Sequence, residues 1–151
     1  MADTTLKGGE KVTAYLKSIA DKVSNPATLR VGFLSGATYP DGTPVAMIAA
    51  INEFGAPSRG QPPRPFFRDM IAAKESEWGP AIAALLKANN YDLKATLELA
   101  GQAIEGQLRQ SITNYNGPAL APSTIKRKGF SKQLVDTGHM LNSIDHEVID
   151  G

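Results

Sequence analysis

Residues 92–112 read DLKATLELAGQAIEGQLRQSI and carry the longest regular apolar pattern in the chain. Its apolar residues recur three or four positions apart, which places them on one stripe of a helix. The stripe consists of Leu93, Leu97, Ala100, Ile104 and Leu108. Asp92 is suited to cap the first turn, because its carboxylate can accept hydrogen bonds from the free amides there. We therefore predict a long amphipathic helix from Asp92 to about Ile112.

Shorter patterns on either side of this segment predict more helices than strands. Helical spacing predicts helices over 12–23 and 44–54 and short helices over 122–128 and 137–141. Another helix starts at Pro65 and is expected to kink at Gly79-Pro80, in preference to a split into two helices there. Alternating apolar and polar residues predict a strand over 28–35, and a second strand is expected over 145–149. The sequence therefore predicts an α+β class, in which several helices pack on a small, mostly antiparallel sheet. We expect a single domain over residues 1–151, with 1–8 flexible.

The composition fits one soluble domain and excludes several kinds of chemistry. Hydrophobic residues make up 42% of the 151 positions, and no apolar run is long enough to cross a membrane. Cys is absent, which excludes disulfides, thiolate metal sites and cysteine nucleophiles. The formal net charge of +1 is too small for a protein that is held to nucleic acid over a whole face. We therefore expect neither membrane binding nor sequence-specific nucleic-acid binding.

The only histidines are His139 and His146, and the patterns of known catalytic sites do not surround them. The chain has no G-x-S-x-G turn, no phosphate-binding loop and no paired metal-ligand spacing. We expect both histidines to be solvated, and we expect carboxylates such as Glu98 and Glu105 to lie on a solvated helix face. The sequence thus predicts no enzyme activity, no cofactor and no metal. A hydrolase that uses His139 or His146 is a distant alternative.

The loop over residues 55–65 has the composition of a contact surface. It holds so many Pro and Gly residues that we expect a stiff and exposed loop, with Arg64 available to a partner protein. Three phenylalanines flank the loop, Phe54, Phe66 and Phe67, and aromatic side chains often anchor interfaces. At least two of these three are expected in the core instead.

Near the end of the chain, a basic stretch is followed by an acidic one. Residues 126–132 contain four basic residues and no acid, namely Lys126, Arg127, Lys128 and Lys132. An acidic stretch without Lys or Arg follows and includes Asp136, Asp145, Glu147 and Asp150. Identical copies arranged head-to-tail in a ring could place the basic stretch of one copy against the acidic stretch of the next. The alternative is that the basic stretch contacts the phosphates of a nucleic acid.

Two motifs together resemble those of tailed-phage tail-completion and head–tail joining proteins. The first is Asn52-Glu53-Phe54-Gly55, a Pro- and Gly-rich spacer, and then Pro63-Arg64-Pro65-Phe66-Phe67-Arg68. It looks like the E-F-G … R-P-F pattern of families related to minor tail protein Z. The second comprises residues 122–129, PSTIKRKG, and 134–144, LVDTGHMLNSI. It is similar to the P-x-T-x-x-R-K-G … T-G-x-L-x-x-S-I region of phage virion-morphogenesis proteins.

This resemblance implies a structural protein of the neck or head-proximal tail end of a phage or prophage particle, required for tail completion and head–tail joining. It implies no enzyme activity. The partners would be other phage structural proteins of the neck, tail terminator or tail tube. The chain would be made in the cytoplasm of the bacterial host and would be oligomeric in the virion, with a ring as one arrangement. The runner-up is a small nucleic-acid-binding protein that uses residues 126–132.

The two motifs and the charge pattern assign two sets of residues. Partner contact is predicted for Glu53, Phe54, Arg64, Phe66, Phe67, Arg68, Lys126, Arg127, Lys128 and Lys132. A structural role is predicted for Gly55, Pro63, Pro65, Thr124, Thr137, Gly138, Leu141 and Ser143. Within the second motif, Thr137 is expected to cap a short helix that turns Met140, Leu141 and Ile144 inward and Ser143 outward.

Overall fold

The computed structural model describes residues 8–117 and 138–151, and within them it confirms the predicted α+β class. The helices are α1 (Gly9–Lys22), α2 (Val45–Phe54), α3 (Phe66–Ala88), α4 (Leu93–Asn114) and α6 (His139–Asn142), with a 3₁₀ turn, η1, at Pro57–Arg59. The strands are β1 (Ala27–Phe33) and β2 (Ile144–Asp150), which form a two-stranded sheet. The helix predicted over 122–128 lies outside the described residues.

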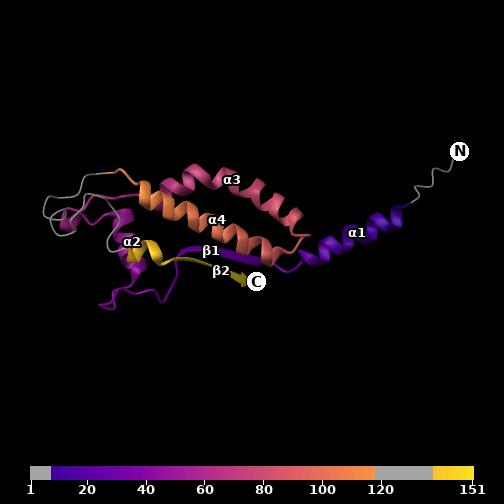
Figure 1. Ribbon diagram of the computed structural model, residues 1–151, viewed down its shortest axis with the longest axis horizontal. Coiled ribbons are helices and arrows are strands. Elements are labelled where there is room, and N and C mark those ends of the chain that lie inside the picture. The colour runs from indigo at the N-terminus through magenta and orange to yellow at the C-terminus, as the bar shows by residue number, and fades with distance from the viewer. Residues whose placement is uncertain (1–7, 118–137) are drawn as a thin grey trace.

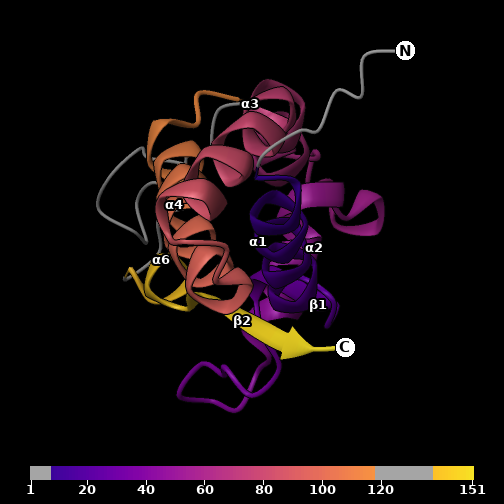
Figure 2. The ribbon, with the colours of Figure 1, turned by 90° about the vertical axis from the view of Figure 1, so that its right-hand side faces the viewer.

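The layers of the molecule are α3, α4 and the sheet, in that order. α4 contacts α3 on one side and both strands on the other, as the end-on view in Figure 2 shows. The strands are antiparallel, with Val31 opposite His146 and Phe33 opposite Ile144. Residues directly opposite each other share a face of the sheet, and this face is the one that α4 covers. On the other face Arg30 pairs with Glu147 at 3.4 Å, in contact with solvent.

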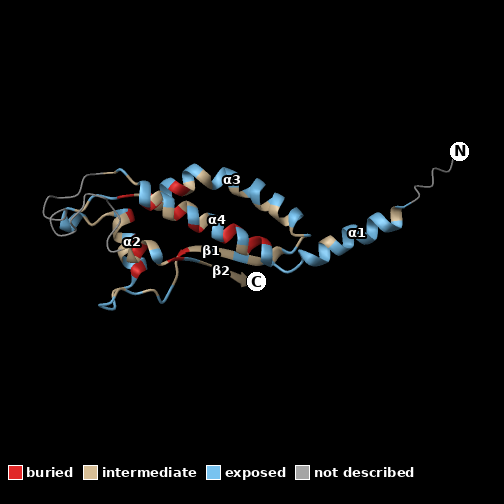
Figure 3. Ribbon diagram, viewed as in Figure 1, coloured by how far each residue is buried: buried red, intermediate tan, exposed pale blue. Residues whose placement is uncertain are grey.

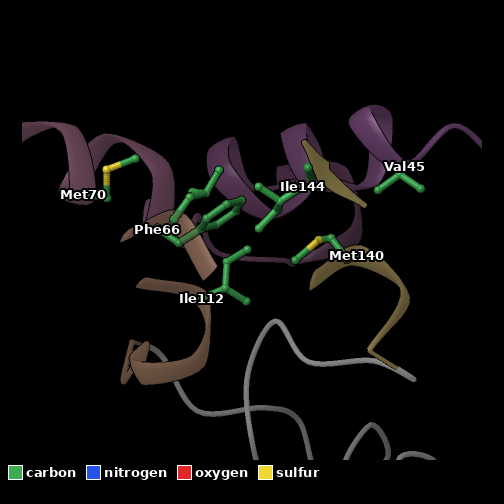
Figure 4. Close-up of a cluster of buried hydrophobic side chains, with 8 residues drawn as sticks. Val45, Phe66, Met70, Ile112, Met140 and Ile144 are labelled. Carbon is green, nitrogen blue, oxygen red and sulfur yellow. The ribbon is translucent and has the colours of Figure 1, made fainter. Parts of the chain in front are cut away.

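The hydrophobic core lies at one end of α4, where four helices and the sheet meet (Figure 4). Its buried members are Val45, Ala49, Phe66, Met70, Leu108, Ile112, Met140 and Ile144. Figure 3 shows the buried residues gathered along α4 and around α2 and the start of α3. These residues are far apart in the sequence. The core therefore forms only when α2, α3, α4 and β2 come together.

The predicted helix starting at Pro65 is one continuous helix, α3, with Pro65 as its N-cap residue. Pro80 lies inside it and does not split it, in agreement with the preference for one helix over two. The predicted long helix is also confirmed as α4. The Asp92 side chain accepts a hydrogen bond from the Ala95 amide at 3.0 Å, and the helix extends two residues beyond Ile112.

Helix α1 has the predicted amphipathic pattern but no buried residue. It extends away from the rest of the molecule, beyond the end of the sheet (Figure 1). Its apolar residues Val12, Tyr15 and Leu16 are each more than half exposed, at 57%, 58% and 59%. The stripe that predicted a packed helix therefore has no packing partner within the described residues.

A search of the described helices for membrane spans gave none with the length and apolar character required to cross a bilayer.

Replacement of Asp92 by Ala should lower the free energy of unfolding by about 1 kcal/mol, because the first turn of α4 loses its side-chain acceptor. Urea denaturation measures this change. Asp21→Ala, an exposed acid in the last turn of α1, is the matched control and should change stability by less than about 0.5 kcal/mol. Equal effects of the two substitutions would contradict the capping role of Asp92.

Candidate functional site

The first motif forms a compact unit, which we call the α2–α3 corner: the last turn of α2, the loop over 55–65 and the first turn of α3. The loop turns back on itself through a bridge between Ala56 and Gln61 and through η1. As a result, the end of α2 lies directly against the start of α3. The two halves of the motif, which are separated by seven residues in sequence, are therefore in contact.

Glu53 connects the two helices at this corner. Its carboxylate is buried and accepts hydrogen bonds from the backbone amides of Phe67 at 2.9 Å and of Arg68 at 3.2 Å. It also pairs with Nε of Arg68 at 2.7 Å. The first turn of a helix has free amides and a partial positive charge, and α3 has no capping side chain of its own. Glu53 thus caps α3 from another helix.

Gly55 allows the loop to return so closely. Its φ is 77°, and a Cβ at this position would lie 2.7 Å from the backbone nitrogen of Pro63 and 2.8 Å from the carbonyl oxygen of Gln61. Any larger residue would have to push the loop away from α2. The structural roles predicted for Gly55 and Pro63 therefore have a direct physical reason, the close contact of their backbones.

The exposure of Arg64 differs from the one that the sequence predicts. It was expected to be exposed, but it is only 8% exposed and its backbone amide donates to the Asn52 carbonyl at 2.7 Å. The guanidinium makes one long contact, 3.5 Å from Nη1 to Oδ1 of Asn52, and its Nε is buried without a hydrogen-bond partner. The fold of the loop encloses this side chain, since the prolines that stiffen the loop also hold it against α2. Arg64 is therefore a buried part of the corner.

The predicted contact residues at the corner divide into two groups. Glu53 and Phe66 are buried with Arg64, and Phe66 belongs to the hydrophobic core, so these three do not face a partner. Phe67 is partly buried against the core, which agrees with the expectation that at least two of the three phenylalanines lie inside. Phe54 is 64% exposed, and the Arg68 guanidinium lies over its ring at 5.0 Å. Of the residues predicted to contact a partner at this corner, Phe54 and Arg68 are thus the accessible ones.

A shallow apolar groove of about 260 Å³ opens at this corner. It is lined by Phe33, Ala46, Ala49, Ala50, Glu53, Phe54, Phe66, Phe67 and Arg68. Both polar groups of the lining are already paired with each other, because Glu53 binds Arg68 and the amides of α3. The open surface of the groove is therefore suited to an apolar side chain.

The second motif is described only from Gly138 onward. Gly138 has a left-handed φ of 73° and is the N-cap residue of α6, with no side-chain cap. The N-cap position thus belongs to a residue whose backbone adopts the left-handed region without strain, while the capping role predicted for Thr137 falls on a residue that is not described. Thr124, Thr137, Lys126, Arg127, Lys128 and Lys132 lie outside the described residues.

The residues that were predicted to face inward in and just after α6 do so. Met140 and Ile144 are buried in the core, and Leu141 packs against it. Ser143 is partly buried, and its hydroxyl donates to the carbonyl of His139 at 2.8 Å. This short helix therefore fixes the start of β2 against α4.

A second candidate site lies between α4 and β2 and consists of Glu98, Glu105, Arg109 and His146. Nε2 of His146 is 2.9 Å from a carboxylate oxygen of Glu98, and Nδ1 contacts the carboxylate of Glu105. Glu105 is buried and also pairs with Arg109 at 2.7 Å. Arg109 donates to the Ile144 carbonyl at 2.8 Å, so the cluster holds β2 to α4 through side chains and backbone.

Gly101 provides the space for the imidazole ring. It lies on α4 between the two acids, and a Cβ there would overlap the ring of His146. The two acids are seven residues apart, which is two helical turns, so they lie on the same face of α4 above and below Gly101. The ring therefore packs directly on the helix backbone.

The contacts of His146 favour its charged form. The hydrogen bond to Glu105 is the largest cause that raises the pKa of His146 above the usual 6.5, burial opposes it, and Glu98 adds to the increase. Only the imidazolium can donate to both carboxylates at once, because a neutral ring has a single N–H. The cluster therefore stabilises the contact between α4 and β2 when His146 is protonated.

These contacts correct the expectation that His146 and Glu105 are solvated, whereas the side chain of Glu98 is 45% exposed and agrees with it in part. The side chain of His146 is only 11% exposed, as is that of Glu105. Sequence reasoning assigned one buried face to α4, but α4 has two, because it lies between α3 and the sheet. The signal in the sequence was the spacing Glu98, Gly101, Glu105, which places two acids and a gap on one helix face.

The cluster also brings together the kinds of ligand atom that a cation site uses. Atoms of Glu105, Asp145 and His146 lie within 4.8 Å of one another. However, Arg109 already neutralises Glu105, and both ring nitrogens of His146 contact carboxylates. A divalent cation would have to displace these partners, so the geometry favours an ion-pair network.

Comparison of the chain with protein-family models, with curated proteins and with solved structures finds no match.

Replacement of Glu53 by Ala should lower the free energy of unfolding by about 2 kcal/mol, because two amides of α3 lose a buried acceptor. Arg68→Ala should cost less than about 1 kcal/mol, since the Arg68 side chain is 56% exposed. Urea denaturation of both variants measures the difference. Glu77→Ala, which breaks only an exposed pair with Lys74, is the matched control, and a loss for Glu53→Ala no larger than in this control would exclude the capping role.

The stability of the protein should fall as the pH rises above about 6.5. The pKa of His146 is raised in the folded state. The stabilisation from its contacts is therefore complete below the pKa of the unfolded state and is lost as the pH rises through the pKa of the folded state. The slope should be at most about 1.4 kcal/mol per pH unit. Denaturation at a series of pH values measures it. His146→Gln should flatten the slope and His139→Gln should retain it; the same slope in His146→Gln would contradict this assignment.

Proposed function

We propose that this chain is a structural protein of the neck or head-proximal tail end of a phage or prophage particle, where it takes part in tail completion and head–tail joining. The proposal rests on the two sequence motifs and on one structural observation, the α2–α3 corner. There, the first motif forms a single unit in which Glu53 joins two helices and leaves Phe54 and Arg68 exposed beside an apolar groove.

The corner supports a binding role for a physical reason. An exposed aromatic ring and an arginine next to an apolar groove are the residue types that contribute most to protein interfaces. Arg68 is held in place by Glu53 and lies over Phe54, so little side-chain freedom is lost when a partner binds. The partners we propose are other phage structural proteins and further copies of the chain, in the virion.

The proposed function does not include catalysis. Among the described residues, the most concentrated group of ionisable side chains is the cluster around His146, and both of its ring nitrogens contact carboxylates. Neither nitrogen is thus directed at a nucleophile, which nucleophilic catalysis requires. The contacts support a structural role for this cluster.

The proposed function predicts that Phe54→Ala and Arg68→Ala lower the yield of infectious particles at least tenfold, because each removes an accessible contact at the corner. The test is complementation of a phage that lacks the gene, with titre divided by the amount of folded chain in the lysate. Arg59→Ala, an exposed arginine in the same loop, is the matched control. Electron micrographs of the defective lysates should show filled heads without tails.

Two outcomes would contradict the proposal. One is an unchanged titre for both corner variants at an unchanged amount of folded chain. The other is binding of duplex DNA in physiological salt that disappears when Lys126, Arg127, Lys128 and Lys132 are changed to Gln, while particles still assemble. The second outcome would favour the nucleic-acid-binding alternative.

A further inference from the structure

Large hydrophobic side chains that are exposed fall mainly in two places in the described part of the chain. Three of them lie on α1, namely Val12, Tyr15 and Leu16, and Val23 follows as the C-cap residue of this helix. Two lie on α2, namely Met47 and Phe54, and Leu99 on α4 is the remaining one. Exposed apolar patches of this kind mark interaction surfaces in soluble proteins. Within the described residues, each copy thus has one apolar helix and one apolar groove that no other part covers.

Helix α1 needs a surface to cover it. It has 14 residues, and isolated helices of this length are marginally stable in water. Its apolar residues form one stripe, which we call the α1 stripe: Val12, Tyr15, Leu16, Ile19 and Val23. No side chain of α1 is buried in the described residues, so residues 8–117 and 138–151 do not supply this surface.

The groove at the α2–α3 corner is suited to receive such a stripe. Its floor is formed by apolar and aromatic side chains, and its volume of about 260 Å³ corresponds to one or two large side chains. Glu53 and Arg68, the charged residues of the lining, already bind each other. An apolar side chain that enters the groove therefore leaves no charge unpaired.

The helix and the groove lie at opposite ends of the long axis of the molecule (Figure 1). The α1 stripe of one copy is thus far from the groove of the same copy. We infer that the α1 stripe packs into the α2–α3 groove of a second copy of this chain, with Tyr15 and Leu16 as the side chains that enter it. This inference rests on the proposed role of the corner as a partner-binding surface, and it names that partner.

The arrangement has a defined symmetry. Each copy gives one helix and receives one, so the contact is heterologous and repeats head-to-tail, which forms a ring where the rotation between copies closes. A pair related by a twofold axis that joins α1 to α1 would leave both grooves empty. The head-to-tail contact covers both apolar features with one interface.

The size of the contact predicts how assembly depends on concentration. Tyr15 alone buries about 150–250 Å² when it is fully covered. The other four residues of the α1 stripe are smaller and, like Tyr15, are already partly covered, so one contact stays below the roughly 1,000 Å² of stable specific interfaces. A single contact is therefore weak. Ring closure gives every copy two contacts, so assembly should be steep in protein concentration.

Cysteine cross-linking tests this inference directly, because the chain has no Cys of its own. Ala20→Cys places a thiol beside the α1 stripe, and Ala50→Cys places one in the groove. The two purified variants are mixed and treated with a short bis-maleimide. The control replaces Ala50→Cys by Ala83→Cys, at an exposed position of α3 that does not line the groove. The Ala20–Ala50 pair should give at least tenfold more covalent dimer than the Ala20–Ala83 pair.

A second substitution tests the stripe itself. Leu16→Asp should abolish the Ala20–Ala50 cross-link without loss of folded protein, because α1 buries no residue in its own chain. The inference is overturned by equal cross-linking to Ala83, by dimers that join Ala20 mainly to Ala20, or by a cross-link that forms within one copy carrying both thiols. A persistent cross-link in Leu16→Asp would also overturn it.

The cross-link and the phage titre separate the two proposals. If the cross-link fails while Phe54→Ala and Arg68→Ala still lower the titre, the inference is wrong and the proposed function stands. If the cross-link forms in the purified protein while the titre is unchanged, the chain assembles as inferred and the proposed function is wrong.

Discussion

A ribbon of two strands cannot bury its own apolar face, and in this chain α4 supplies the surface that covers it. The packing of α4 on the sheet brings together β1 and β2, which lie more than a hundred residues apart. Apolar side chains form one end of this contact and the cluster around His146 forms the middle. There the ring of His146 packs on Gly101 between two acids, so α4 and β2 are joined by both packing and polar contacts. Helix α3 packs on the other side of α4, so its position depends on the same layer.

At the α2–α3 corner a carboxylate likewise joins two elements, here the helices α2 and α3. Glu53 places its carboxylate at the free amides of α3, so a helix that begins at a proline has its cap supplied by the preceding helix. The same carboxylate binds Arg68 and holds it beside Phe54. The buried part of the motif therefore builds the corner, and the exposed part faces outward. A sequence motif of this kind combines structural and binding residues, and only their burial separates them.

The two ends of the molecule have complementary properties. One end carries a helix with an uncovered apolar stripe, and the other carries an apolar groove whose charges are already paired. A chain with one such feature at each end is suited to head-to-tail assembly, because identical copies can cover both features with the same contact. Self-assembly of this type is compatible with the structural role that we propose.

The sequence by itself determined the elements whose signals are local. The spacing of leucines predicted α4, Asp92 predicted its start, and alternation predicted β1, because each of these signals involves residues within a few positions of one another. The tertiary structure alone decided which surfaces face each other. It buried Arg64, made Glu53 the cap of another helix and brought His146 between two acids from which it is separated by more than forty residues. Periodicity shows that an element has an apolar face, but it does not show which other element covers that face, since this depends on contacts between distant parts of the chain.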